Sequence, residues 1–293
     1  MSPTALALIL LAGVIHASWN IAAKKAGGDA RFAAFTSLVI MVVWAPVGIW
    51  LGIDELPSWG RVEWAFLVAS GVLHTVYYVV LLRGYRKADL TVVYPMARGS
   101  GPLLTSLVAV LWLVETISAL GTVGVAAVVI GVFFLAGGPG LWRASQDPSR
   151  KQRVHKGIVY GLVTGVFISG YTVVDGYAVK FLLMSPILID YIGNFVRLAF
   201  LMPSVLRDVP AAAVLWKRQR KYAILVGIIS PVSYMLVLYA VKTAPLSHVA
   251  PAREVSMLFA ALMGGHLLGE GDRKERLAGA VCIAAGVTAL AIG

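Results

Sequence analysis

Long apolar segments recur along the whole chain, and they constrain its fold more than any other feature of the sequence. An apolar segment of roughly 20 residues crosses the hydrocarbon core of a bilayer as an α-helix. Ten such segments cover most of the chain, at residues 3–23, 32–52, 62–83, 91–113, 117–137, 157–179, 186–206, 222–241, 246–268 and 275–292. The sequence therefore predicts an all-α integral membrane protein with ten transmembrane helices.

The composition agrees with a membrane protein and leaves no room for a soluble catalytic domain. Hydrophobic residues make up 59% and charged residues 13% of the chain, and the mean hydropathy is +0.84. These values lie far from those of soluble domains. Because the loops between the predicted spans are mostly short, any binding site must lie within the helix bundle. The single cysteine, Cys282, excludes an intramolecular disulfide and a cysteine-based metal site.

The net charge of +11 is distributed in a way that indicates membrane orientation, and we expect no nucleic-acid partner. The loops after even-numbered spans contain only Arg61, Lys180 and Lys242. Because basic loops remain in the cytoplasm, we expect a multi-pass protein of the bacterial inner membrane with both termini in the periplasm. The loops after odd-numbered spans contain 19 basic residues, namely Lys24, Lys25, Arg31, Arg83, Arg86, Lys87, Arg143, Arg150, Lys151, Arg153, Lys156, Arg207, Lys217, Arg218, Arg220, Lys221, Arg273, Lys274 and Arg276.

The two halves of the sequence repeat one another. Each copy contains five predicted spans, and because five is odd, the second copy must enter the membrane from the opposite side. We therefore expect two inverted repeats, at residues 1–142 and 157–293, joined by a basic cytoplasmic linker at 143–156. Offsets of 156 and then 155 residues pair Gly71 with Gly227, Tyr78 with Tyr234, Pro95 with Pro251, Arg98 with Arg253, Glu115 with Glu270, Gly124 with Gly279 and Gly131 with Gly286.

Two corresponding sequence patterns resemble a known family. The first half contains A-D-L-T-V-V-Y-P-M-A-R, L-V-E and G-x6-G, and the second half contains A-P-L-S-H-V-A-P-A-R, L-G-E and G-x6-G. These patterns are similar to the EamA type of the drug/metabolite transporter superfamily, over essentially the whole chain. The resemblance implies a basket-like bundle that exports amino acids and amphipathic compounds, and overall likeness favours the branch that exports aromatic amino acids. One departure is that Val114 precedes Glu115 where Gly269 precedes Glu270.

Polar and aromatic side chains share one face of several predicted spans. Membrane helices turn such faces away from lipid, so we expect these side chains to line a substrate cavity for an amphipathic molecule. Trp19 could instead belong to the interfacial aromatic belt, and each histidine could be a neutral hydrogen-bonding group between helices. The stripe in the span at 186–206 also contains Asp190 and Arg197. The expected cavity residues are His16, Trp19, Asn20, His74, Tyr77, Tyr78, Tyr171, Asp175, Asn194 and Tyr234.

Arg98 and Arg253 lie deep in predicted spans, where an unpaired arginine costs about 2.5–3.5 kcal/mol. Each follows a proline, Pro95 or Pro251, which frees backbone carbonyls by opening the helix. We expect Arg98 to bind a substrate carboxylate. Arg253 is expected to have a structural or gating role with these prolines, through Glu254 or Asp175.

Two carboxylates, Glu115 and Glu270, fall at the ends of predicted spans. A carboxylate in such a position is expected to cap the following helix or to face water.

The predicted mechanism is alternating access around a cavity between the two halves, with a small-molecule substrate, in the lipid bilayer, as a monomer and with no cofactor. The sequence contains no nucleotide-binding fingerprint. A lipid-linked sugar flippase on the same fold is an alternative, which a lateral opening lined by Trp and Phe would favour. An intramembrane enzyme is a second alternative, but His16, His74, Asp175 and Asp190 scatter over four spans without metal-ligand spacing, so we predict no catalytic or metal-binding residues. Asp175 or Glu254 could carry a proton.

Overall fold

The computed structural model describes residues 1–27, 29–88, 90–136, 148–263 and 273–293. These residues form helices connected by short loops, and no strand occurs among them. A short 3-10 helix, η1 (Leu56–Ser58), follows α3. The α-helices are α1 (Pro3–Lys25), α2 (Ala30–Val43), α3 (Ala45–Glu55), α4 (Arg61–Lys87), α5 (Leu90–Trp112), α6 (Ala119–Leu135), α8 (Pro148–Lys180), α9 (Pro186–Leu206), α10 (Val209–Thr243), α11 (Leu246–Ala252), α12 (Val255–Met263) and α13 (Arg273–Ile292).

Within the described residues, six helices are long and apolar enough to cross a membrane, or seven if the bent pair α2–α3 is one span. The six are α1, α4, α8, α9, α10 and α13. The other predicted spans fall on shorter or interrupted helices: α5 contains two internal prolines, α6 has 17 residues, and α11 and α12 lie within the predicted segment 246–268, of which residues 264–268 lie outside the described residues. The prediction of an all-helical membrane protein is therefore confirmed.

Two predicted spans are each divided into two helices. The axes of α2 and the α3 segment differ by 64°, and Pro46 stands in the first turn of α3. Proline lacks a backbone N–H and clashes with the preceding turn, so the helix breaks at Trp44. Pro251 similarly lies near the end of α11, and Arg253 and Glu254 occupy the turn before α12.

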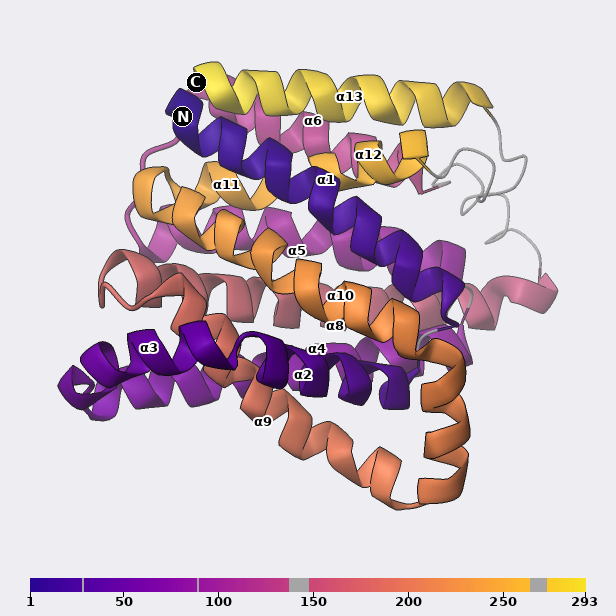
Figure 1. Cartoon of the computed structure of the whole chain (residues 1–293). Helices are drawn as coiled ribbons and strands as arrows, with labels where there is room; N and C mark the ends of the chain where they lie inside the picture. The colour runs from indigo at the N-terminus through magenta and orange to yellow at the C-terminus, as the bar shows by residue number, and fades with distance from the viewer. Residues whose placement is uncertain (28, 89, 137–147, 264–272) are drawn as a thin grey trace.

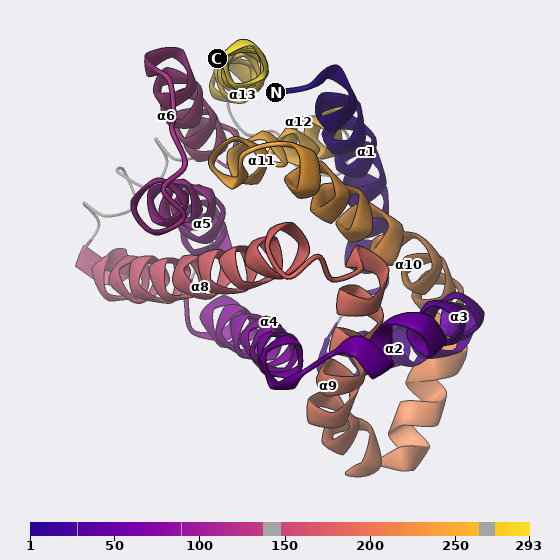
Figure 2. The ribbon, with the colours of Figure 1, turned by 90° about the vertical axis from the view of Figure 1, so that its left-hand side faces the viewer.

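Helices from the two halves of the sequence pack against one another throughout the bundle. The most extensive contacts join α6 to α13, α5 to α8, α1 to α10 and α4 to α8. Most helices run side by side, and both termini lie at the same end of the bundle (Figure 1). The amino group of Met1 donates to the carbonyl oxygen of Ala291 at 2.8 Å. Figure 2 shows α6 and α13 at one edge of the bundle, with α2 and α9 at the opposite edge.

The interface between α6 and α13 depends on glycines. A Cβ atom on Gly131 would lie 2.8 Å from the carbonyl oxygen of Gly279, and one on Gly286 would lie 2.8 Å from that of Gly124. Small residues let membrane helices approach to backbone contact. The four glycines that the sequence repeat pairs therefore meet at one interface between the halves.

Candidate functional site

An aromatic cluster lies where α4 meets α8 and α10, and it consists of His74, Tyr77, Tyr171 and Tyr234. The His74 ring stacks on Tyr171 with centroids 3.9 Å apart. Tyr234 meets His74 edge-on at 5.6 Å, and Tyr77 lies 5.6 Å from Tyr171. Aromatic pairs at such separations stabilise one another beyond their buried area. The cluster thus joins one helix of the first half to two helices of the second.

Asp175 of α8 lies beside this cluster and is fully buried. Tyr234 donates its hydroxyl hydrogen to Oδ2 of Asp175, whereas Oδ1 has no hydrogen-bond partner among the described residues. His74 Nδ1 donates to the carbonyl oxygen of Ser70 at 3.0 Å. The cluster therefore has a polar side that contains an incompletely satisfied carboxyl group.

A small pocket opens between α4, α9 and α10. Its free volume is about 10 Å³, which is close to the space that one water molecule needs. A Cβ atom on Gly193 would meet nothing within 4 Å, so this wall borders open space. The pocket must widen before it can hold a metabolite. Its lining residues are His74, Ile189, Asp190, Gly193, Arg197 and Tyr234.

Asp190 and Arg197 bring opposite charges to the same wall of the pocket, since both lie on α9. Both belong to the described part of the chain, where no ion pair joins them. The side-chain amide of Asn194 donates to the backbone oxygen of Asp190 at 2.7 Å, and its own Oδ1 is left without a partner there. A wall with separated charges suits a ligand that itself carries both signs.

The buried arginines are arranged differently from the expectation. Arg98 of α5 reaches across to Glu254, with Nη2 and Oε2 2.9 Å apart, and it also donates to Ser256 at 3.3 Å. Arg253 instead donates to the Tyr171 hydroxyl at 3.2 Å. Consecutive residues of a helical turn point in different directions, which explains why Glu254 pairs with the distant arginine and not with its neighbour.

The two prolines expected to accompany these arginines differ in their effect. Pro95 lies inside α5, which continues to Trp112, whereas α11 ends one residue after Pro251. Only the second proline is thus followed by a break that places its arginine in a turn.

Four expected cavity residues lie apart from the aromatic cluster. His16 meets Trp19 edge-on at 4.8 Å, and Trp19 packs against the side chains between α1, α2 and α10. Asn20 is exposed and donates to the backbone of His16 within its own helix. Tyr78 donates to the backbone oxygen of Asp29 at 3.1 Å, so the repeat partners Tyr78 and Tyr234 have different environments.

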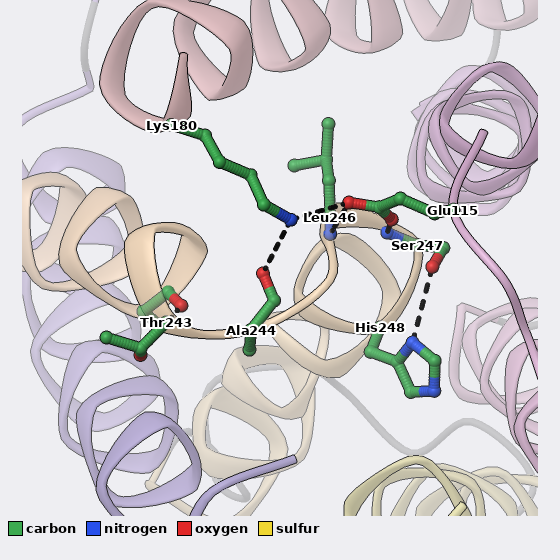
Figure 3. Close-up of polar contacts among 8 residues, drawn as sticks. Glu115, Lys180, Thr243, Ala244, Leu246, Ser247 and His248 are labelled. Carbon is green, nitrogen blue, oxygen red and sulfur yellow. Dashed lines mark hydrogen bonds and ion pairs between the residues drawn. The ribbon is translucent and has the colours of Figure 1, made fainter. Parts of the chain in front are cut away.

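Glu115 forms a contact between the halves that the sequence did not predict. We call this contact the Glu115 latch, and it consists of Glu115, Lys180, Leu246 and Ser247 (Figure 3). Lys180 Nζ lies 2.9 Å from Oε1 of Glu115, and the backbone N–H groups of Leu246 and Ser247 donate to its two oxygens, each at 2.9 Å. Glu115 was expected to cap the following helix or to face water. That expectation was wrong, because Ser118 caps α6 and Glu115 caps α11 of the other half.

The charge of Glu115 is stabilised by this geometry. Burial by itself would raise the pKa of Glu115, but hydrogen bonds from Ser247, Lys180 and Leu246 outweigh it and lower the pKa below its usual value. Val114, just before it, has a φ of 55°, in the left-handed region that favours glycine. Gly269, the residue at the corresponding position of the second copy, lies outside the described residues. The contacts of Glu115 with Leu246 and Ser247, 131 and 132 positions away, could not be inferred from local sequence, and Glu270 lies outside the described residues.

In the part of the chain that the structure describes, no group of three or more His, Cys, Asp or Glu side chains could hold a metal ion.

Similarity to known proteins identifies the family to which the chain belongs. No curated protein matches it. A crystal structure of a protein is similar over 100% of this chain and 98% of that chain, with a TM-score of 0.77 and 14% sequence identity, a likeness that concerns the fold alone. The sequence model of the EamA-like transporter family matches residues 3–137 and again residues 155–292. The chain therefore belongs to the EamA-like transporter family, whose members are multi-pass membrane transporters of small molecules.

Proposed function

We propose that this membrane transporter exports amino acids, with aromatic amino acids favoured, by alternating access between two inverted five-helix halves. The observation that carries the proposal is the pocket between α4, α9 and α10, which has aromatic walls and two opposite charges that form no ion pair within the described part of the chain. Helices from both halves form it, so a movement of one half against the other changes its access.

The substrate class follows from the chemistry of these walls. An amino acid carries a carboxylate and an ammonium group beside its side chain. Arg197 would bind the carboxylate through its planar guanidinium group, and Asp190 would bind the ammonium group. His74 and Tyr234 would contact a flat aromatic side chain. Arg98 is the less favourable carboxylate ligand, because Glu254 already neutralises it.

The proposed architecture has ten spans, in which α2–α3 and α11–α12 each count as one. Repeats at 1–142 and 157–293 would be joined by a cytoplasmic linker at 143–156, of which residues 143–147 lie outside the described residues. In this proposed architecture the basic loops face the cytoplasm, so both termini lie in the periplasm of a bacterial inner membrane. A C-terminal reporter that is active only in the cytoplasm should then be silent, and a strong signal from it would contradict this orientation.

The described conformation corresponds to a closed state of the cycle. The pocket has room for about one water molecule, and the Glu115 latch closes the bundle at the end where the termini lie. In the proposed orientation that end is periplasmic. Opening of the opposite end would admit substrate from the cytoplasm.

Binding of radiolabelled phenylalanine to the purified protein in detergent tests the site. Gly193→Leu would fill the pocket and should abolish binding, whereas Gly193→Ala adds one methyl group to open space and serves as the matched control. Binding that survives Gly193→Leu would contradict the assignment of this pocket.

A lipid-linked sugar flippase is a second candidate, and a lateral groove favours it. The groove has a volume of about 490 Å³ and lies on the opposite face of α9 from the pocket, bordered by α3 and α4. Trp64 and Phe195 line it together with Ile49 and Ile53, all of them exposed. Such a surface fits a lipid chain. Movement of a fluorescent lipid-linked sugar across liposomes, without amino acid transport, would support this candidate over the first.

A further inference from the structure

We propose that Asp175 is a proton-binding site whose proton is exchanged for the substrate, so that transport is coupled to the proton gradient. This inference rests on the proposed transport function. Among the described residues, two carboxylates, Asp175 and Glu254, are fully buried in the bundle, and their surroundings differ in a way that selects between them.

Asp175 accepts a hydrogen bond from Tyr234, and no cation of the described residues lies in ion-pair contact with it. Tyr234 donates to Oδ2, and Oδ1 has no partner among the described residues, although the carboxyl group is 0% exposed. A buried carboxylate without a paired cation is costly in a membrane interior. The neutral acid is much less costly, and its proton can be given up when water reaches the group.

Glu254 has the opposite environment. The guanidinium group of Arg98 lies 2.9 Å from its Oε2, so the positive charge favours the ionised carboxylate. Removing the charge from Glu254 would leave Arg98 uncompensated. Glu254 is therefore a fixed member of an ion pair between the halves, and Asp175 is the carboxyl group free to change its protonation state.

The groups that face Asp175 from its neighbours do not alter this conclusion. The charged groups are Asp190 of α9, whose negative charge opposes a second ionised carboxylate, and Arg253, which donates to Tyr171. From α5, which also packs on α8, Arg98 is held by Glu254. The uncharged polar groups are Ser70 and His74 of α4 and Tyr234 of α10.

Tyr234 connects this site to the pocket. Its ring lines the pocket and its hydroxyl binds Asp175, so a substrate that displaces Tyr234 also removes this donor and admits water. The proton then passes from the Asp175 carboxyl group to pocket water, and Asp175 takes up a proton again from the other side after the substrate has left. Proton and substrate thereby occupy the transporter in turn.

Infrared difference spectroscopy tests the protonation state without any substrate. The purified protein at neutral pH should show the C=O stretch of a protonated carboxyl group, which should titrate as the pH rises. Asp175→Asn should lose this band, and Asp190→Asn, the matched carboxyl control, should retain it. A spectrum unchanged by Asp175→Asn would overturn the proposal even if transport were confirmed.

The coupling itself is tested with phenylalanine and a pH gradient. Proteoliposomes with equal phenylalanine inside and outside should expel it when the outside is made acidic, and Asp175→Asn should lose this effect while still exchanging labelled for unlabelled phenylalanine. One exchanged proton changes the apparent Kd by about tenfold per pH unit over the titration range of Asp175. Exchange without any response to the gradient in the wild type would refute the coupling but not the transport; absence of both would refute the transport.

Discussion

Replacing Glu115 with glutamine should weaken the Glu115 latch without changing its shape. Glutamine has one acceptor oxygen, so it can keep one backbone hydrogen bond but loses the other and the ion pair with Lys180. Hydrogen bonds to charged groups contribute about 1.5–3 kcal/mol each. The side chain of Lys180 is 27% exposed and that of Glu115 is 9% exposed, so solvent screens part of the ion pair. A total loss of about 2–3 kcal/mol corresponds to an increase of about 30- to 150-fold in the open fraction of the latch.

A single cysteine measures this opening. Cys282 is the only cysteine, so Cys282→Ala provides a clean background, and Ser247→Cys introduces a thiol at a position that is 0% exposed. The backbone N–H of residue 247 still donates to Glu115 in this variant. The rate of labelling by a membrane-impermeant maleimide should rise by the same factor when Glu115→Gln is added.

A second variant separates the contributions within the latch. Lys180→Met removes the ion pair but leaves both backbone hydrogen bonds of Glu115, so its labelling rate should rise less. Equal labelling of the parent and Glu115→Gln, or greater opening in Lys180→Met, would show that capping of α11 does not hold the halves together.

Three further predictions concern stability, measured as melting temperature in detergent. The pKa of Glu115 is lowered on folding, so its carboxylate stabilises the protein above the usual glutamate pKa of about 4.3. The difference in melting temperature between wild type and Glu115→Gln should thus be full at pH 7 and shrink as the pH falls below about 4; a difference independent of pH would contradict the role of the charge. Val114→Gly should raise stability by about 0.5–1 kcal/mol, because the left-handed conformation costs a non-glycine residue about 1–2 kcal/mol and glycine loses about 0.5–1 kcal/mol in chain entropy. Gly286→Ala should lower stability by about 1–3 kcal/mol through overpacking, while Gly193→Ala, whose methyl group enters open space within a helix, should not lower it; equal melting of the two would argue against tight packing of α13 on α6.

The sequence was sufficient for the fold class because a membrane span has a strong local signal. Apolar length located most of the helices, whereas the breaks at Trp44 and after α11, which lie beside Pro46 and Pro251, were not visible in the apolar pattern. The sequence could not show that Pro95 leaves α5 continuous, since neighbouring helices determine whether a proline interrupts a membrane helix.

The site was less predictable because contacts between helices depend on how each helix is rotated. The predicted stripes on α4, α8 and α10 include the members of the aromatic cluster, whereas Tyr78 lies one residue further round α4 and binds the loop before α2. Arg197 was visible in the stripe of α9, but only the fold places it at the pocket. The repeat indicated equivalent positions and not equivalent partners.

Efflux from proteoliposomes tests the central claim most directly. Vesicles containing the wild type, Gly193→Leu or Gly193→Ala would be loaded with radiolabelled phenylalanine, tryptophan, threonine or a sugar phosphate. If the protein exports aromatic amino acids through this pocket, the wild type and Gly193→Ala should release phenylalanine and tryptophan, and Gly193→Leu should release little of either. Release of none of these solutes by the wild type, or release unaffected by filling the pocket, would contradict this claim.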